Sequence, residues 1–151
     1  MSGMFNYCRS LEKINFSNFN TENVTDISNM FFGCDALKKI NLSNNVINMS
    51  FMFRRCYSLK KLFISKFNTN NAIAMSGMLF ECSSLNKLNI YNFNANKVTN
   101  MSQMFQGCSS LKKLNISNFN INKVTNITDM LDDYSDDLKN KIKKQNKNIV
   151  I

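Results

Sequence analysis

The sequence predicts an α/β solenoid in which one short strand and one short helix recur in every coil. Three observations carry this prediction: an internal period of 26 residues, apolar positions at helical spacing, and an alternating segment after each of them. The cysteines mark the period, with separations of 26, 22, 26 and 26 residues. They are Cys8, Cys34, Cys56, Cys82 and Cys108.

The period divides the chain into five full repeats and a degenerate sixth. The repeats run 1–26, 27–48, 49–74, 75–100 and 101–126, and the sixth segment spans 127–151. A unit of this length cannot bury its apolar side chains alone, so the repeats are expected to stack on one shared core. The sequence therefore predicts one domain with a parallel sheet of stacked strands and a C-terminal cap.

Each repeat begins with a segment at helical spacing. In the fifth repeat, Met101, Met104, Phe105 and Cys108 stand at i, i+3, i+4 and i+7, which is one apolar face of two helical turns. Asn100 precedes this segment and can cap a helix through its side-chain oxygen. Equivalent capping residues precede three other segments: Asp26, Asn48 and Asn126.

An alternating segment follows, and it predicts the strand. Leu114 and Ile116 are apolar, whereas Lys113, Asn115 and Ser117 are polar, so the polar side chains are expected to face solvent. In the sixth segment the pattern changes to a helical one that is expected to cap the stack. Its apolar positions are Met130, Leu131, Tyr134, Leu138 and Ile142.

Composition excludes several classes of enzyme. The chain has no histidine, which removes every triad that uses imidazole as its base and every imidazole metal site. The cysteines stand one full repeat apart rather than at zinc-ligand spacing, so they are interpreted as core thiols. We therefore expect no enzymatic activity, no cofactor and no metal. No apolar run is long enough to span a membrane, and the first residues do not have the pattern of a signal peptide.

The repeat pattern resembles a known family. Met-Phe-x-x-Cys-Ser-Ser-Leu-x-x-Leu-x-Ile-Ser-x-Phe, followed by Val-Thr-Asn-Met-Ser, is similar to the BspA-like leucine-rich repeat of bacterial surface proteins, a relative of the treponemal type. The resemblance covers residues 1–126. It implies a right-handed leucine-rich-repeat stack and a surface or secreted protein that mediates adhesion, binding a protein or an acidic glycan, such as a host extracellular matrix protein, through its concave sheet.

The outward strand positions are the candidate binding site. The first of them is a lysine in every full repeat: Lys13, Lys39, Lys61, Lys87 and Lys113. Phe63 and Tyr91 interrupt the neighbouring polar columns, and aromatic side chains among lysines are typical of interface anchors. Arg54 and Arg55 add charge to the third repeat, which contains no acidic residue. Two interpretations are open. Either this lysine row attracts an anionic partner, or duplication of the repeat copied a lysine that only faces solvent.

Two alternatives remain open at this stage. The chain, with a formal charge of +9, could be an intracellular binder of nucleic acid or another polyanion, although it contains no recognised nucleic-acid motif. The first repeat would expose an apolar edge formed by Met1, Met4, Phe5 and Leu11. Self-association or further upstream repeats would cover that edge, so the chain is either a fragment of a longer surface protein or a short cytoplasmic member.

Overall fold

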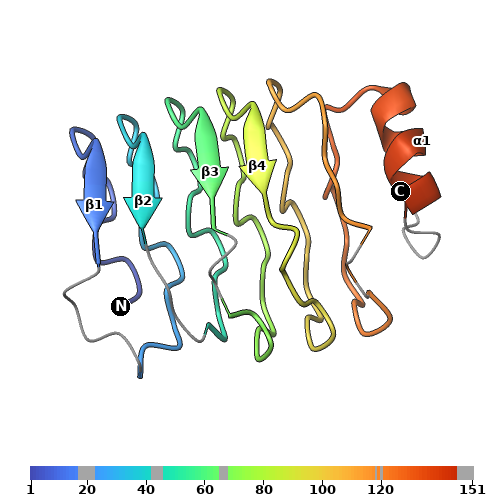
Figure 1. Ribbon diagram of the computed structural model, residues 1–151, viewed down its shortest axis with the longest axis horizontal. Helices are drawn as coiled ribbons and strands as arrows, with labels where there is room; N and C mark the ends of the chain where they lie inside the picture. Colours follow the sequence, from blue (N-terminus) through green and yellow to red (C-terminus); the bar gives the residue numbers. More distant parts are fainter. Residues whose placement is uncertain (17–22, 42–45, 65–67, 118, 120, 146–151) are drawn as a thin grey trace.

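The structure of the protein is a computed structural model that describes residues 1–16, 23–41, 46–64, 68–117, 119 and 121–145. The side chains of Lys39, Asn41 and Phe63 lie outside this description. The sequence repeats lie side by side along the long axis of the molecule, and a helix stands at the C-terminal end (Figure 1).

In the described part of the chain, four strands of three residues form two separate parallel sheets. β1 pairs with β2 and β3 pairs with β4, in a register that places equivalent repeat positions opposite each other, such as Ile14 opposite Ile40. Isolated parallel bridges link the repeats a second time, at the last residue of each repeat. The strands are β1 (Lys13–Asn15), β2 (Lys39–Asn41), β3 (Lys61–Phe63) and β4 (Lys87–Asn89). The bridges join Asp26, Asn48, Ala74, Asn100 and Asn126 in succession.

The segments expected to be helical form turns instead. Each of these segments contains six consecutive turn residues, which we call a turn run. The second and sixth residues of every turn run have a positive φ, as Gln103 (φ 57°) and Gly107 (φ 73°) do. An α-helix requires φ near −63° at every residue, so two left-handed residues in six exclude it. The turn runs are 2–7, 28–33, 50–55, 76–81, 102–107 and 128–133.

The prediction of an α/β solenoid, with a helix in every coil and one continuous parallel sheet, is therefore wrong. Among the described residues the only helix is C-terminal, the strands form two two-stranded sheets, and 113–117 of the fifth repeat form no strand. The physical reason lies in the backbone hydrogen bonds. The N–H groups of Gln103 and Phe105 donate to Thr128 O (2.9 Å) and Met130 O (3.2 Å) of the next repeat, rather than along a helix.

The expected helix caps still act locally. Asn100 Oδ1 accepts a hydrogen bond from the N–H of Ser102 at 2.9 Å, two residues ahead, and Asp26 accepts one from Ser28 at the same distance. Such bonds start a turn as readily as a helix. The capping pattern in the sequence therefore marks where each turn run begins without specifying that a helix follows.

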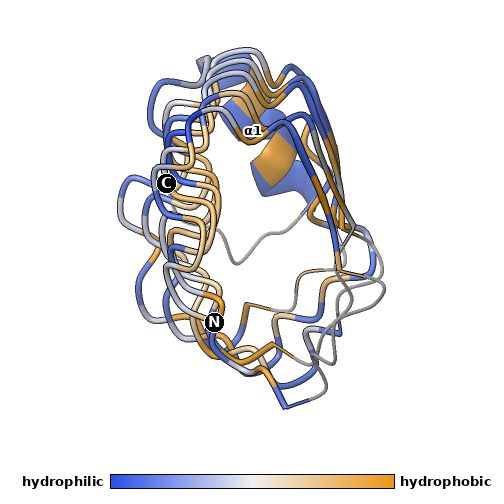
Figure 2. Ribbon diagram, turned by 90° about the vertical axis from the view of Figure 1, so that its left-hand side faces the viewer, coloured by the Kyte–Doolittle hydropathy of each residue, from blue (hydrophilic) through white to orange (hydrophobic). Residues whose placement is uncertain are grey.

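The apolar columns point inward, as the sequence predicts. Viewed along the stack, the turn runs form one wall and the strands the opposite wall, with hydrophobic residues between them (Figure 2). Phe31 and Phe53 are fully buried, and their rings stack at 5.6 Å between centroids with 7° between the planes. Stacking of equivalent side chains from successive repeats makes the core continuous along the molecule.

Helix α1 (Asp136–Gln145) covers the C-terminal end of the stack. It begins later than the apolar spacing predicts, because Met130 and Leu131 belong to the last turn run. The side-chain amide of Gln145 accepts a hydrogen bond from the N–H of Ile116 (3.1 Å) and donates one to Leu114 O (3.2 Å). These bonds satisfy backbone groups that a further strand would otherwise pair.

The first repeat is more open than those that follow it. Met4 is 53% exposed and Phe5 is half-buried, whereas the equivalent Met30 and Phe31 of the second repeat are fully buried. Met1 and Leu11 are half-buried as well. The apolar edge expected from the sequence is therefore present in this chain.

Candidate binding site

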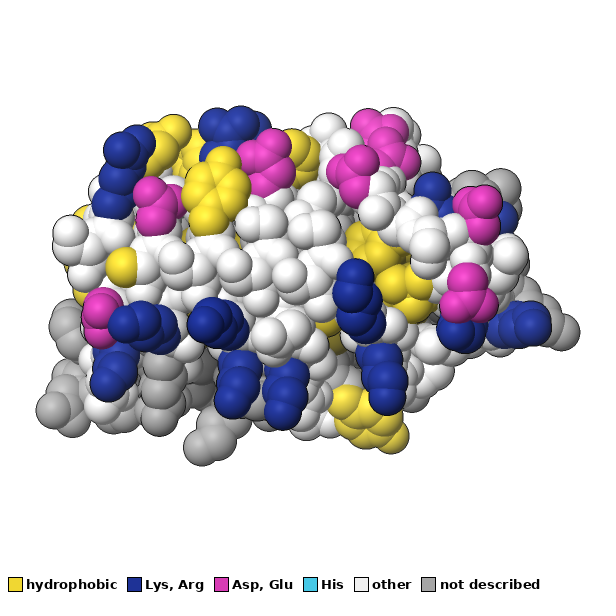
Figure 3. All heavy atoms as spheres, turned by 90° about the horizontal axis from the view of Figure 1, so that it is seen from above, with side chains coloured by type: hydrophobic (Ala, Val, Ile, Leu, Met, Phe, Trp, Pro, Cys, Tyr) yellow, Lys and Arg dark blue, Asp and Glu magenta, His cyan; other side chains and the backbone are white. Residues whose placement is uncertain are grey.

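The lysine row lies where each strand begins. Lys13 stands opposite Lys39, and Lys61 stands opposite Lys87, in parallel pairs. Neighbouring strands in a sheet lie about 4.8 Å apart, so the lysines of paired strands start from closely spaced backbone positions. The side chains of Lys13, Lys61, Lys87 and Lys113 are exposed, and a row of basic side chains crosses the lower half of Figure 3.

Acidic side chains do not neutralise this row. Among the described residues, no carboxylate lies within 4.0 Å of the ammonium groups of Lys13, Lys61, Lys87 and Lys113. The neighbouring Glu12 pairs with Lys38 at 2.7 Å, and this hydrogen bond, helped by the charges of Lys38 and Lys13, lowers the pKa of Glu12. The unpaired ammonium groups therefore remain available to an anionic partner.

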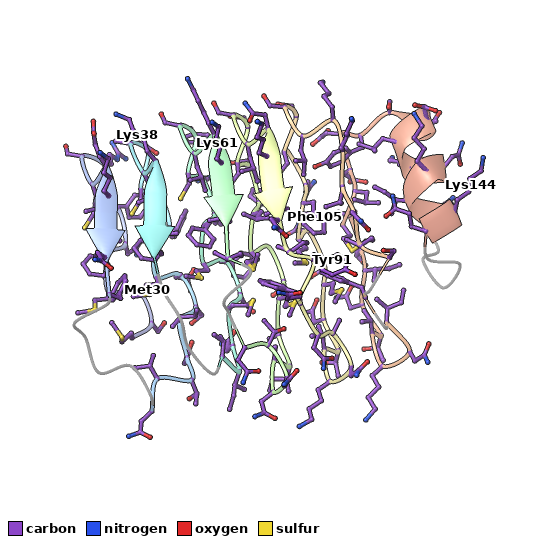
Figure 4. All side chains as sticks on the ribbon, in the orientation of Figure 1. Met30, Lys38, Lys61, Tyr91, Phe105 and Lys144 are labelled. Atoms are coloured by element: carbon purple, nitrogen blue, oxygen red, sulfur yellow. The ribbon has the colours of Figure 1, made fainter. Side chains whose placement is uncertain are left out.

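The two candidate aromatic residues do not join the lysines in a described cluster. Tyr91 is 60% exposed, but it lies beyond the end of β4, whereas Lys61 stands at the start of β3 (Figure 4). Phe63 occupies the last position of β3, opposite Asn89, and its side chain lies outside the described part of the chain. Tyr91 is thus a separate exposed aromatic side chain at the opposite end of the strands.

The structure places Arg54 and Arg55 away from the lysine row. Both belong to the third turn run, on the wall opposite the strands. Arg55 Nε lies 2.7 Å from Glu81 Oε2, and this hydrogen bond raises the pKa of the Arg55 guanidinium. The hydroxyl of Tyr57 donates to the same Glu81 oxygen at 3.2 Å. The charge of the third repeat is therefore divided between two walls of the molecule.

Sequence reasoning missed a second surface, built around Arg54. Its guanidinium carbon lies 5.2 Å from the ring centre of Phe32, 5.4 Å from that of Phe51 and 4.8 Å from that of Phe80. Arginine stacks on aromatic rings and is, with tyrosine, enriched at the centres of protein interfaces. We call this surface the arginine–aromatic patch. It comprises Tyr7, Arg9, Phe32, Phe51, Arg54, Arg55, Tyr57 and Phe80.

A signal for the patch exists in the sequence. Met30, Met52 and Met78 occupy the same position in consecutive repeats. The residues two positions after them are Phe32, Arg54 and Phe80. On a helix this position would point away from the core, where a solvated side chain is the ordinary expectation. The stacking of three consecutive repeats brings the side chains of this column together.

The cysteines are structural thiols in the described structure. Cys34, Cys56, Cys82 and Cys108 are buried and free, and each Sγ donates to a backbone oxygen of the preceding repeat at 2.9–3.1 Å. Cys8 is exposed. The described residues contain no group of three or more Cys, Asp or Glu side chains that could hold a metal ion.

Burial of these thiols predicts alkaline sensitivity. Desolvation raises the pKa of Cys34 and Cys108 from 9.0 to about 12. Because the folded pKa is the higher one, the thiols contribute their full stabilisation below pH 9, and it is lost as the pH rises towards 12. We expect the urea midpoint of unfolding to fall steadily between pH 9 and pH 11. A Cys34→Ala/Cys108→Ala variant should show a shallower fall, and an equally steep one would contradict this explanation.

A shallow pocket lies at the C-terminal end. Its volume is about 370 Å³, and it is lined by residues 125–132 and by Lys139 of α1. Asp129 and Asp132 on its rim give this end of the turn-run wall a negative charge. The pocket therefore differs in charge from both the lysine row and the arginine–aromatic patch.

Comparison with known proteins identifies one family. The model of a family described as Mycoplasma protein of unknown function, DUF285, matches residues 1–44 and 35–145. No curated protein matches the sequence. In the part of the chain that the structure describes, no helix is both long and apolar enough to cross a membrane.

Proposed function

The chain belongs to the DUF285 family of Mycoplasma proteins of unknown function, and from this premise we propose that it is a non-catalytic binding module for an anionic protein or glycan. The lysine row carries the proposal. Its exposed ammonium groups follow one another along the strand wall, and the described carboxylates leave them unpaired. A linear array of like charges suits a partner whose negative charges are also spaced along a chain.

The resemblance to BspA-like repeats supports a partner outside the cell. Members of that family mediate adhesion, so we propose a surface or secreted location and a ligand such as an acidic glycan or a host matrix protein. The proposal assigns the contact to the strand wall. Tyr91 lies on the same side and is 60% exposed, so it can add an apolar contact at the margin of the site.

Charge reversal of the lysine row tests this proposal. We expect Lys61→Glu/Lys87→Glu/Lys113→Glu to weaken binding to heparin, used as a sulfated glycan probe, by at least about tenfold at low salt. The matched control reverses three lysines outside the row (Lys97→Glu/Lys123→Glu/Lys144→Glu) and has the same net charge. Surface plasmon resonance measures both variants.

The control variant distinguishes specific binding at the lysine row from a general attraction to the net charge of the protein. The row variant should lose far more affinity than the control, and equal losses would show that net charge alone attracts the glycan. A random DNA duplex tested alongside distinguishes the polyanion alternative. Tighter binding to DNA than to heparin, with a steep salt dependence, would replace the proposed ligand with a nucleic acid.

A further inference from the structure

The outer surface of the six turn runs, which we call the turn face, has opposite charges at its two ends. The N-terminal half holds all three arginines of the chain, Arg9, Arg54 and Arg55, together with the aromatic rings of the patch. The last turn run holds Asp129, Asp132 and Asp133. In the upper part of Figure 3, basic and hydrophobic side chains gather on the left with acidic ones between them, and a group of acidic side chains lies to the right of centre.

The opposite charges occupy the same columns. Asp132 stands at the repeat position of Arg54, and Asp133 stands at that of Arg55, three repeats further on. At about 4.8 Å for each repeat, the two charged groups of a column lie roughly 14 Å apart along the axis. They are too distant to pair within one molecule. A second molecule running in the opposite direction would bring each arginine against an aspartate.

Arg54, in contrast to the other two arginines, has no carboxylate partner among the described residues. Arg9 lies 3.8 Å from Asp35 and Arg55 lies 2.7 Å from Glu81, but none of the described carboxylates lies within 4.0 Å of Arg54. Its Nε is buried, and no hydrogen-bond acceptor for it lies among the described atoms. The surrounding rings hold the guanidinium in place, so it is oriented before a partner arrives.

We propose that the turn face binds a second copy of this chain in a two-fold, antiparallel dimer. The third repeat of each copy faces the sixth repeat of the other. Arg54 of each copy therefore contacts the partner's Asp132, and the dimer contains two equivalent contacts of this kind. Such an isologous interface is self-complementary, as two-fold symmetry requires. The wall that carries the lysine row remains free, so the dimer presents two lysine rows on opposite sides and goes beyond the binding function proposed above.

The centre of this interface suits close approach. The two-fold axis would pass between the fourth and fifth turn runs, where the partly exposed positions hold Phe80, Gln103, Gln106 and Gly107. None of these side chains is charged, and Glu81, the one charged residue there, is already paired with Arg55. An uncharged centre flanked by complementary charges is typical of protein interfaces.

Charge-swapped variants test the dimer. Sedimentation equilibrium on the full chain at low salt, up to about 1 mM protein, should show a dimer whose dissociation constant rises with salt. Arg54→Asp and Asp132→Arg should each weaken dimerisation by at least about tenfold. An equimolar mixture of the two variants should form a heterodimer as tight as the native dimer, because both contacts then join opposite charges.

Matched controls separate this interface from general charge effects. Lys61→Asp changes the net charge as Arg54→Asp does, and Glu12→Arg changes it as Asp132→Arg does. Both control substitutions lie away from the turn face, so these variants should dimerise as the native chain does. A native chain that stays monomeric, or a mixture that does not associate, would overturn the proposal. If Arg54→Asp fails to fold, Asp132→Arg at a half-buried rim position decides alone: unchanged dimerisation of that variant would also overturn the proposal.

Discussion

Replacing Phe53 by alanine is expected to lower the free energy of unfolding by about 3–5 kcal/mol, the usual cost of deleting a buried ring. Phe53 is fully buried in the third repeat and stacks on Phe31 of the second. Because the repeats share one core, a cavity here also weakens the contact between the two halves of the molecule. Urea unfolding followed by circular dichroism measures the loss.

Tyr57→Ala provides the control for the Phe53 variant. Tyr57 belongs to the same repeat but is 42% exposed, so its truncation should cost less than about 1 kcal/mol. A loss of similar size for both variants would show that the third repeat does not contribute a rigid central core. A smaller m-value for Phe53→Ala would indicate that the two halves unfold separately.

Gly77→Ala is expected to destabilise the protein by about 2–3 kcal/mol, although alanine is the smallest change available. Gly77 has a φ of 55°, but this alone is tolerated, since Phe51 and Gln103 adopt the same conformation at equivalent positions. The distinguishing feature is the Phe51 ring, which occupies the space that a Cβ on Gly77 would take. The alanine must therefore displace the ring, and with it the stacking on Arg54.

The chain provides an internal control for this effect. Gly3 has a φ of 62° in the first repeat, and nothing lies within 4 Å of a Cβ placed on it, so Gly3→Ala should cost only the left-handed backbone penalty of about 1 kcal/mol. Adding Phe51→Ala to Gly77→Ala should recover part of the loss in a double-mutant cycle. Additive losses in that cycle would contradict the proposed clash.

Turn residues also illustrate why the fold class could not be obtained from periodicity. Met101, Met104, Phe105 and Cys108 are all buried, as helical spacing predicts, yet Met104 and Phe105 lie in a turn run, and Met101 and Cys108 directly flank it. An α-helix and the observed turn run both place these four side chains on the core side. They differ in the acceptors of the N–H groups. In the structure, the N–H groups of Met101 and Phe105 bond to the next repeat, whereas those of Met104 and Cys108 bond three residues back. Hydropathy patterns contain no information about these acceptors.

The candidate site was partly predictable for a related reason. Alternation along the strand correctly places Lys61 and Lys87 on the outside, because side chains on a strand point to opposite faces whatever the neighbouring segments do. The grouping of Arg54 with Phe32 and Phe80 depends on the alignment of three repeats in space. This grouping therefore cannot be predicted from the sequence of any single repeat.

The sequence by itself determined the 26-residue unit, the apolar columns that fill the core and the exposed positions of Lys13, Lys61, Lys87 and Lys113, since these follow from periodicity and burial. The tertiary structure alone decided that turn runs replace helices, that the sheet divides in two, and that Gln145 closes the last repeat. Each of these depends on which repeat satisfies a given backbone hydrogen bond. That pairing is a property of stacked neighbours, and it arises only when the repeats are assembled.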